Sequence, residues 1–260
     1  MQELLRAGAN VEAPDAVGRR PLHHAAFHRA SHAAKSLIGA GADVDAADSN
    51  GVRPLHVAAW HDATAAAMTL MEAGADIEAA DSAGRRALHW ASIYDAPAAT
   101  RILIAAGADI EAADSAGQRP LHWAAGYSAL AAAKILIEHG VNVDSTNSWD
   151  QTALHLAAVR GCVDAVELLV GVGANLHARD KTGRTPQELA RGHGRFDVVA
   201  ALKEGMDSRF SMPSAQPGLG KQEDNEWDWT CFYAPMSAWD PLIRECAPIF
   251  IPTSGFPVRQ

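Results

Sequence analysis

Cysteine is scarce in this 260-residue chain, and its three residues share no spacing typical of a disulfide framework or a zinc site. They are Cys162, Cys231 and Cys246. A reducing compartment, the cytoplasm or the nucleus, is therefore the expected location. Apolar runs of membrane-spanning length are also missing, and the N-terminus lacks the basic and apolar segments of a secretion signal. We accordingly expect a soluble intracellular protein without a membrane partner.

Motifs that carry catalysis are missing as well. The sequence has no glycine-rich phosphate loop, no Gly-x-Ser-x-Gly and no zinc-protease motif. Cys162 falls on an expected helix-opening turn, without a residue that would serve as its base. We predict a protein that is not an enzyme and that has no catalytic residue, no cofactor and no metal site.

Positive charge is in short supply, with 22 basic against 31 acidic residues and a net charge of −9. Binding to nucleic acid depends on neutralising phosphates with lysine and arginine. The balance argues against a nucleic-acid partner, although it leaves room for a local basic patch.

What the chain does contain is a repeat. The stretch Gly84–Ser92, Gly-Arg-Arg-Ala-Leu-His-Trp-Ala-Ser, recurs in similar form at a constant spacing of 33 residues. The copies open at Gly18, Gly51, Gly84, Gly117 and Asp150, and a decayed copy opens at Gly183. Such a period is the mark of an array in which each unit stacks on its neighbours.

One unit is predicted to form two short helices and a loop. Apolar and small residues at 87–93 indicate a first helix of about two turns. Pro97 suits the first turn of a second helix over 98–106, which Gly107 ends. Turn-forming residues then lead to the next unit. Because two short helices bury little apolar surface alone, the units must share one continuous core.

The repeats resemble the ankyrin repeat family over about residues 1–205: they have its period and most of its Thr-Pro-Leu-His signature, as in Arg-Pro-Leu-His at 20–23. The resemblance implies an all-α solenoid of stacked helix-turn-helix units with projecting β-turn loops. The boundaries expected are a partial N-terminal repeat at 1–17, five full repeats at 18–182, a capping repeat at 183–205 and a disordered acidic-aromatic tail at 206–260. Since the chain begins inside the second helix of a unit, a truncated start is favoured over a makeshift cap.

A histidine occupies the same position in five successive units: His23, His56, His89, His122 and His155. Neighbouring helices pack about 8–10 Å apart, whereas the imidazoles of one zinc site lie about 2 Å from the metal, so the ladder cannot form a single metal site. The resemblance implies a structural role, in which each histidine bonds its own unit's threonine and the backbone across the repeat boundary.

The threonine position departs from the family pattern. It is Arg in four units (Arg20, Arg53, Arg86 and Arg119) and Thr only at Thr152 and Thr185. The loop position at which the family has asparagine is acidic instead: Glu12, Asp45, Glu78, Glu111 and Asp144. We expect Arg-carboxylate pairs between adjacent units, rather than a basic stripe for an anionic partner.

In ankyrin repeats, the two residues after the Ala-Ala pair lie on the concave surface and vary with the partner. Here aromatic residues recur at these positions, and rings that offer apolar area with a polar end are favoured in binding hot spots. The candidate partner-binding residues are Phe27, His28, Trp60, His61, Ile93, Tyr94, Tyr127, Trp149 and Arg160. Together these residues would form an extended groove for the partner. Trp90 and Trp123 could border this groove or pack inside it. Alternatively, the rings fill volume left by alanine-rich second helices.

The sequence therefore predicts a monomeric scaffold or adaptor that binds a protein or peptide. An alternative is the targeting arm of a larger enzyme or ubiquitin-ligase assembly, with the tail recruiting the effector; a third is an array without a specific partner. The tail holds seven of the 13 prolines and, in 223–229, alternates acids with tryptophans. Such a pattern is typical of either a short docking motif or an unselected tail.

Overall fold

The computed structural model describes residues 8–210, and the regular elements in this part are all α-helices. Each unit contributes two helices, as the repeat predicts. The first helices are α2 (Pro21–Phe27), α4 (Pro54–Trp60), α6 (Ala87–Ile93), α8 (Pro120–Gly126), α10 (Ala153–Arg160) and α12 (Pro186–Gly192). The second helices are α3 (Ser31–Gly39), α5 (Thr64–Glu72), α7 (Pro97–Ala105), α9 (Leu130–Glu138), α11 (Val163–Gly171) and α13 (Phe196–Phe210).

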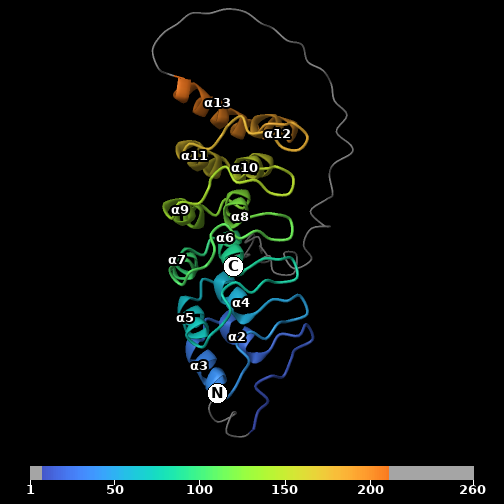
Figure 1. Cartoon of the computed structure of the whole chain (residues 1–260), viewed down its shortest axis with the longest axis vertical. Helices are drawn as coiled ribbons and strands as arrows, with labels where there is room; N and C mark the ends of the chain where they lie inside the picture. The colour runs from blue at the N-terminus through green and yellow to red at the C-terminus, as the bar shows by residue number, and fades with distance from the viewer. Residues whose placement is uncertain (1–7, 211–260) are drawn as a thin grey trace, which may run out of the picture. The chain divides into compact units, whose positions relative to one another are not determined.

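The units stack in one row, with three layers across the row (Figure 1). The first helices form the middle layer, the second helices lie on one side of them, and the loops project on the other. Each first helix packs against its own second helix and against the first helices of the neighbouring units. This is the solenoid that the repeat predicts.

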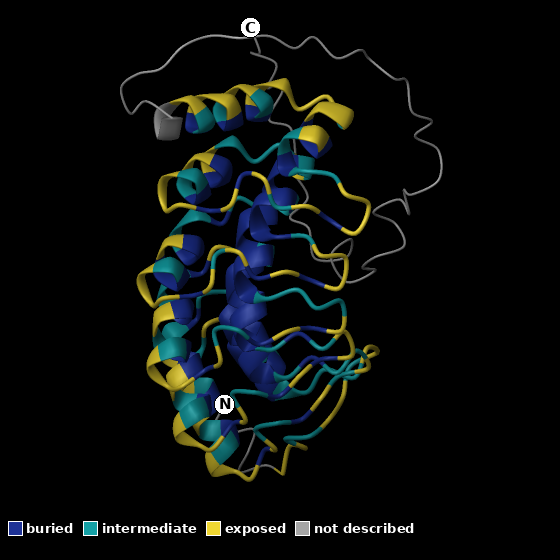
Figure 2. Ribbon diagram, turned by 45° about the horizontal axis from the view of Figure 1, so that its top comes forward, coloured by how far each residue is buried: buried dark blue, intermediate teal, exposed yellow. Residues whose placement is uncertain are grey.

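The core follows the middle layer, where the first helices are the most deeply buried elements (Figure 2). A leucine at the same position in the five full units is at most 2 % exposed, and alanines beside it allow close approach of neighbouring helices. These leucines are Leu22, Leu55, Leu88, Leu121 and Leu154. The last unit has Gln187 at this position, and Leu189 is its buried leucine. Stacking thus joins small apolar faces into one core that a single unit lacks.

The tight turn between the two helices of a unit needs a left-handed residue. Arg29, Asp62, Asp95 and Ser128 have φ between 49° and 55°, and the turn that follows α10 has Gly161 instead. Left-handed backbone is unfavourable for residues with a side chain. Asp62 and Asp95 offset this cost, because their Oδ1 atoms accept bonds of 2.6 and 2.9 Å from backbone N–H groups of the next unit, at Ala99 and Ala132.

The ladder histidines are structural, as the resemblance implies. In each, Nδ1 accepts the backbone N–H of the residue that precedes the first helix, at 3.1 Å in His89. The opposite nitrogen, Nε2, donates to a backbone carbonyl, which lies in the next unit for His23, His89, His122 and His155. The bond between threonine and histidine survives at Thr152, whose Oγ1 is 2.9 Å from His155 Nδ1.

Both bonds of a ladder histidine require a neutral ring, in which Nδ1 is free to accept and Nε2 carries the proton. Burial disfavours the charged form in the same direction. It lowers the pKa of His89 and of His122 from 6.5 to about 4.

The expected Arg-carboxylate pairs are present between adjacent units. Arg20 contacts Glu12, Arg86 contacts Glu78 at 2.5 Å, and Arg119 contacts Glu111 at 3.2 Å. The acids have a second task, because Glu78 Oε1 also accepts the backbone N–H of Asp109, 31 residues further along the chain, at 2.9 Å. Each such acid therefore ties one loop to the loop of the next unit.

The last helix differs from expectation at its end. A stop near Gly205 was predicted, but α13 continues to Phe210. Gly205 lies inside this helix and not at its end: a Cβ there would lie 2.5 Å from Val170 Cγ1, so glycine lets α13 approach α11 closely. The predicted acidic-aromatic motif at 223–229 lies outside the described residues.

Candidate partner-binding face

The positions predicted to contact a partner end each first helix and open the turn that follows it. We call this surface the turn face. It comprises Phe27 and His28, Trp60 and His61, Ile93 and Tyr94, Gly126 and Tyr127, and Val159 and Arg160. Because the units stack in register, equivalent residues of adjoining units lie side by side on it.

Six rings at one end of the turn face form a continuous cluster, which we call the ring cluster: Phe27, His28, Trp60, His61, Trp90 and Tyr94. Phe27 meets His61 edge-on at 4.4 Å between ring centroids, and Trp60 lies 4.9 Å from Tyr94. Trp90 packs beneath, 5.7 Å from Trp60 and 6.1 Å from Tyr94. Contacts of this kind add to the apolar area that the rings bury.

A second group lies further along the row. The Arg160 guanidinium sits over the Tyr127 ring at 4.2 Å from its centroid, and the Trp123 ring stacks on the Tyr127 ring with 5.8 Å between centroids. Gly126 lies beside this arrangement, and a Cβ there would make an ordinary contact of 3.6 Å with the Arg160 side chain. The cation–π contact holds the charged group of Arg160 in a defined place.

Exposure separates the predicted residues. Phe27 is 42 % exposed and Trp60, His61, Tyr94 and Tyr127 are half-buried, whereas Ile93 is 6 % exposed and offers little surface to a partner.

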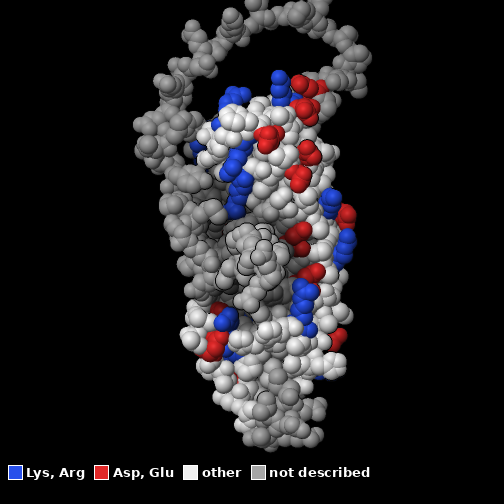
Figure 3. All heavy atoms as spheres, turned by 180° about the vertical axis from the view of Figure 1, so that it is seen from behind, with Lys and Arg blue, Asp and Glu red and all other residues white. Residues whose placement is uncertain are grey.

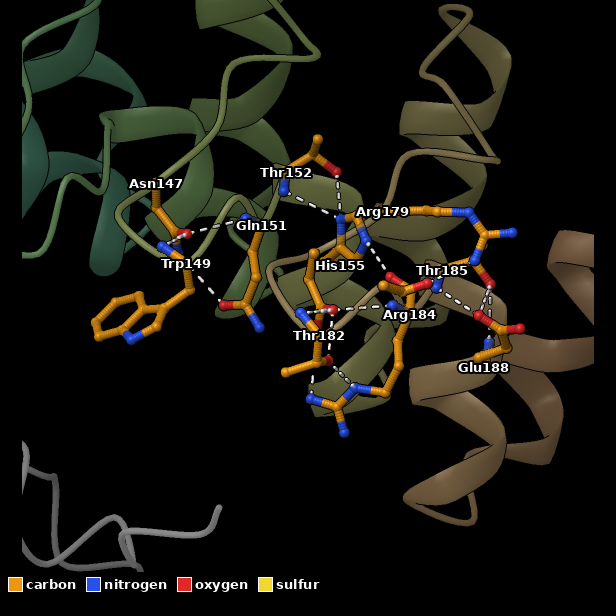
Figure 4. A network of polar contacts seen from close by, with 12 residues as sticks. Asn147, Trp149, Gln151, Thr152, His155, Arg179, Thr182, Arg184, Thr185 and Glu188 are labelled. Carbon is orange, nitrogen blue, oxygen red and sulfur yellow. Dashed lines mark hydrogen bonds and ion pairs between the residues drawn. The ribbon is translucent and has the colours of Figure 1, made fainter. Parts of the chain in front are cut away.

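Trp149 stands apart, on a loop rather than on the turn face. It is 37 % exposed, and its indole points away from the surrounding polar network (Figure 4). Its backbone N–H is held by Asn147 Oδ1 at 2.9 Å. The loop is therefore fixed while the ring projects from it.

Of the two tryptophans expected either to border the partner-binding face or to pack inside it, Trp90 packs inside and is 2 % exposed. Trp123 is half-buried. Sequence reasoning missed the reason. Asp81 Oδ2 accepts a bond of 3.1 Å from Trp90 Nε1 and one of 2.9 Å from Arg85 Nε, and the Arg85 guanidinium lies 4.5 Å from the centre of the Trp90 ring. The spacing of Asp81 and Arg85, with a tryptophan nine residues after the acid, was the available signal.

His61 carries a buried polar atom within the ring cluster. Its Nε2 is enclosed and has no hydrogen-bond partner among the described residues. Burial lowers the pKa of His61, and the charges of Arg29 and His28 lower it further. A neutral imidazole against Phe27 and Trp60 leaves the cluster predominantly apolar.

Two arginines near the other end of the turn face are not neutralised. Within residues 8–210, neither Arg160 nor Arg195 forms an ion pair, and Arg195 Nε donates to the Val159 carbonyl at 3.2 Å. Figure 3 shows lysine and arginine atoms at the end of the array that holds α12 and α13, with acidic atoms beside them, and further basic atoms along the array. Arg195 and the 70 % exposed Phe196 were missed in the sequence because the last unit is decayed.

The free cysteine beside these arginines does not have the properties of a nucleophile. Cys162 Sγ donates to the Gly126 carbonyl at 3.4 Å. Burial raises the pKa of the thiol, although the charges of Arg160 and Arg195 act in the opposite direction. The described residues also contain no group of three potential metal ligands and no helix long and apolar enough to cross a membrane.

Comparison with known proteins agrees with the geometry. A family model of ankyrin repeats matches residues 1–81, 74–147 and 139–210. The crystal structure of the human ASB11 ankyrin repeat domain is 28 % identical, with a TM-score of 0.65 over 72 % of this chain and 84 % of that chain. The ankyrin repeat domain of Bcl-3, described as a unique member of the IkappaB protein family, is 28 % identical, with a TM-score of 0.64 over 78 % and 90 %. A comparison with curated protein sequences found no match.

Proposed function

The chain belongs to the ankyrin repeat family, and we propose that it is a scaffold or adaptor that holds a protein or peptide partner on its turn face. Ankyrin repeats are generally protein-interaction modules, so the family supplies the class of function. The observation that carries the proposal for this chain is the ring cluster, which brings Phe27, Trp60 and Tyr94 into contact across three units.

The ring cluster has the properties of a binding hot spot. Its aromatic groups are fixed by contacts with each other, so little side-chain entropy remains to be lost when a partner binds. Phe27 nevertheless keeps 42 % of its surface exposed, and a partner could cover it. Tyrosine and tryptophan also bring polar groups that can bond a partner's backbone.

The test is affinity capture from cell lysate with the full chain and with a variant carrying Phe27→Ala, Trp60→Ala, Tyr94→Ala and Tyr127→Ala. We expect a protein to be captured by the full chain and lost by the variant. Circular dichroism must show that the variant remains helical. Because Trp60 is half-buried, the single variant Phe27→Ala, which removes a ring that is 42 % exposed, should show the same loss in weaker form.

A matched control removes exposed apolar surface elsewhere. Met68, on α5, is 46 % exposed and Val172, just after α11, is 43 % exposed, so Met68→Ala with Val172→Ala changes the side of the array that carries the second helices. This control should capture the partner normally. Capture that survives loss of the turn-face rings would contradict the proposal and favour a targeting arm that acts through another part of the chain.

A further inference from the structure

The turn face changes character along its length. We number the units from the first full repeat, so that unit one opens at Gly18 and unit six at Gly183. Aromatic rings and histidines occupy units one to three, and the guanidinium groups of Arg160 and Arg195 follow at units five and six. This change from rings to guanidinium groups follows the repeat. His28, His61, Tyr94, Tyr127 and Arg160 occupy equivalent positions in successive units.

Neither Arg160 nor Arg195 forms an ion pair with another described residue. Elsewhere in the array, arginines such as Arg86 and Arg101 face carboxylates of neighbouring units, at 2.5 and 3.5 Å. Arg160 is instead held against Tyr127, and Arg195 against the Val159 carbonyl, so both groups are oriented but remain available to an anion. An oriented guanidinium is well suited to bind a carboxylate through paired hydrogen bonds.

The middle of the face disfavours an anion. Asp62 and Asp95 open the turns of units two and three, and both carboxylates already accept backbone N–H groups from the next unit. An acidic partner residue over these units would meet like charge. Arg29, at the start of the face, is an exposed cation beside the ring cluster, and its charge acts on His61.

We propose that the partner segment is an extended peptide that seats a bulky apolar side chain on the ring cluster and places acidic side chains on Arg160 and Arg195. This inference rests on the proposed function and names the chemistry of the partner. Two units separate Tyr94 from Arg160, and helices that pack about 8–10 Å apart put them about 20 Å apart. An extended chain rises about 3.3 Å per residue, so about six residues should separate the apolar anchor from the acids.

The test uses synthetic fluorescent peptides and the full chain, with binding followed by fluorescence anisotropy. Each peptide carries one tryptophan and one pair of glutamates in a Gly-Ser background, separated by about two, about six or about ten residues. We expect the tightest binding at the middle spacing. Replacing both glutamates by glutamine should weaken that binding about tenfold, which corresponds to about 1.4 kcal/mol.

Variants of the protein should reproduce this loss. Arg160→Ala with Arg195→Ala should weaken the middle-spacing peptide about tenfold and remove its preference over the glutamine peptide. Arg101→Ala is the matched control, because Arg101 is exposed but paired with Glu138 on the second helices. It should leave binding unchanged, and all variants should keep the helical signal of the full chain.

Three results would overturn the inference. The affinity could be the same with glutamate and with glutamine, or the same at all three spacings. A peptide whose acids lie beside Arg29 could also bind more tightly, with that gain lost in Arg29→Ala. None of these would remove the proposed function, which depends on the rings. If a captured protein still requires Phe27, Trp60 and Tyr94 but not Arg160 and Arg195, the adaptor function stands and the acidic partner is wrong.

Discussion

The ladder histidines make the stability of this array sensitive to mild acid. Their folded-state pKa values lie below the ordinary value of 6.5, at about 4 for His89 and His122, because burial disfavours the charged ring. A depressed pKa means that the unfolded chain binds a proton first as the pH falls. The stabilisation is therefore complete above pH 6.5 and is lost as the pH falls toward 4.

We predict a fall in the free energy of unfolding on the order of 3 kcal/mol for each of these two histidines across that range. Urea unfolding at a series of pH values, followed by circular dichroism, measures it. Asp15, whose pKa is about 2, keeps its charge throughout this range and does not explain such a fall. A free energy of unfolding that stays level between pH 6.5 and pH 4 would show that the neutral ladder is not a source of stability.

The buried pair of Asp81 and Arg85 supports the floor of the ring cluster, and Asp48 provides its matched control. Asp48 Oδ1 accepts two backbone N–H groups of its loop, at 2.8 and 2.9 Å. Asp81 makes the equivalent two bonds and in addition binds Arg85 and Trp90. We predict that Asp81→Ala lowers the free energy of unfolding by about 3 kcal/mol more than Asp48→Ala, because it removes the carboxylate that pairs with a buried guanidinium and bonds Trp90.

Chemical unfolding of the two variants checks this difference, and a double variant tests its cause. Unit two has Val52 at the position of Arg85. Adding Arg85→Val to Asp81→Ala should therefore recover part of the loss, because both members of the buried pair are then replaced by apolar side chains. Equal losses for Asp81→Ala and Asp48→Ala would mean that the buried pair contributes nothing beyond the loop bonds.

At the level of helices and loops, glycines of similar backbone conformation have different tasks. Gly84, with φ of 78°, opens unit three, and a Cβ there would lie 2.7 Å from the Ser115 backbone nitrogen of the next loop. Gly107, with φ of 93°, ends α7, and a Cβ there would meet nothing within 4 Å. Only the first is needed for the close approach of two units.

We predict that Gly107→Ala costs about 1–2 kcal/mol, the usual penalty of a left-handed residue with a side chain. Gly84→Ala should cost clearly more, because it adds a clash with the next loop to the same backbone penalty. Thermal or urea unfolding of the two variants gives the comparison. If their stabilities were equal, the loops would not be packed as closely as the structure shows.

The same elements show how far sequence reasoning reaches. The period, the leucine and alanine positions and Pro97 predicted α6 and α7 almost to the residue, because these features act within one unit. The predicted end of α13 was wrong. Gly205 by itself favours a helix end, but here it lies inside the helix and close to Val170. Helix ends that depend on a neighbouring unit cannot be predicted from local preference.

The candidate site was predictable to the same limit. The repeat register identified the positions of Phe27, Trp60 and Tyr94, and the structure brings their rings together. The burial of Ile93 and the support of Trp90 by Asp81 depend on packing and hydrogen bonds in three dimensions, which the register does not specify. Arg195 was missed because its unit had lost the signature that marks the turn face.

For the molecule as a whole, the central claim is that the partner binds the turn face and not the side formed by the second helices. Site-specific photocrosslinking tests this claim directly. A photoreactive phenylalanine placed at Tyr94, in the ring cluster, is compared with one placed at Met68, which is 46 % exposed on α5. Both full-length proteins are irradiated with the captured partner. We predict a covalent adduct from position 94 and none from position 68; an adduct from position 68 alone, or equal adducts from both, would contradict the account.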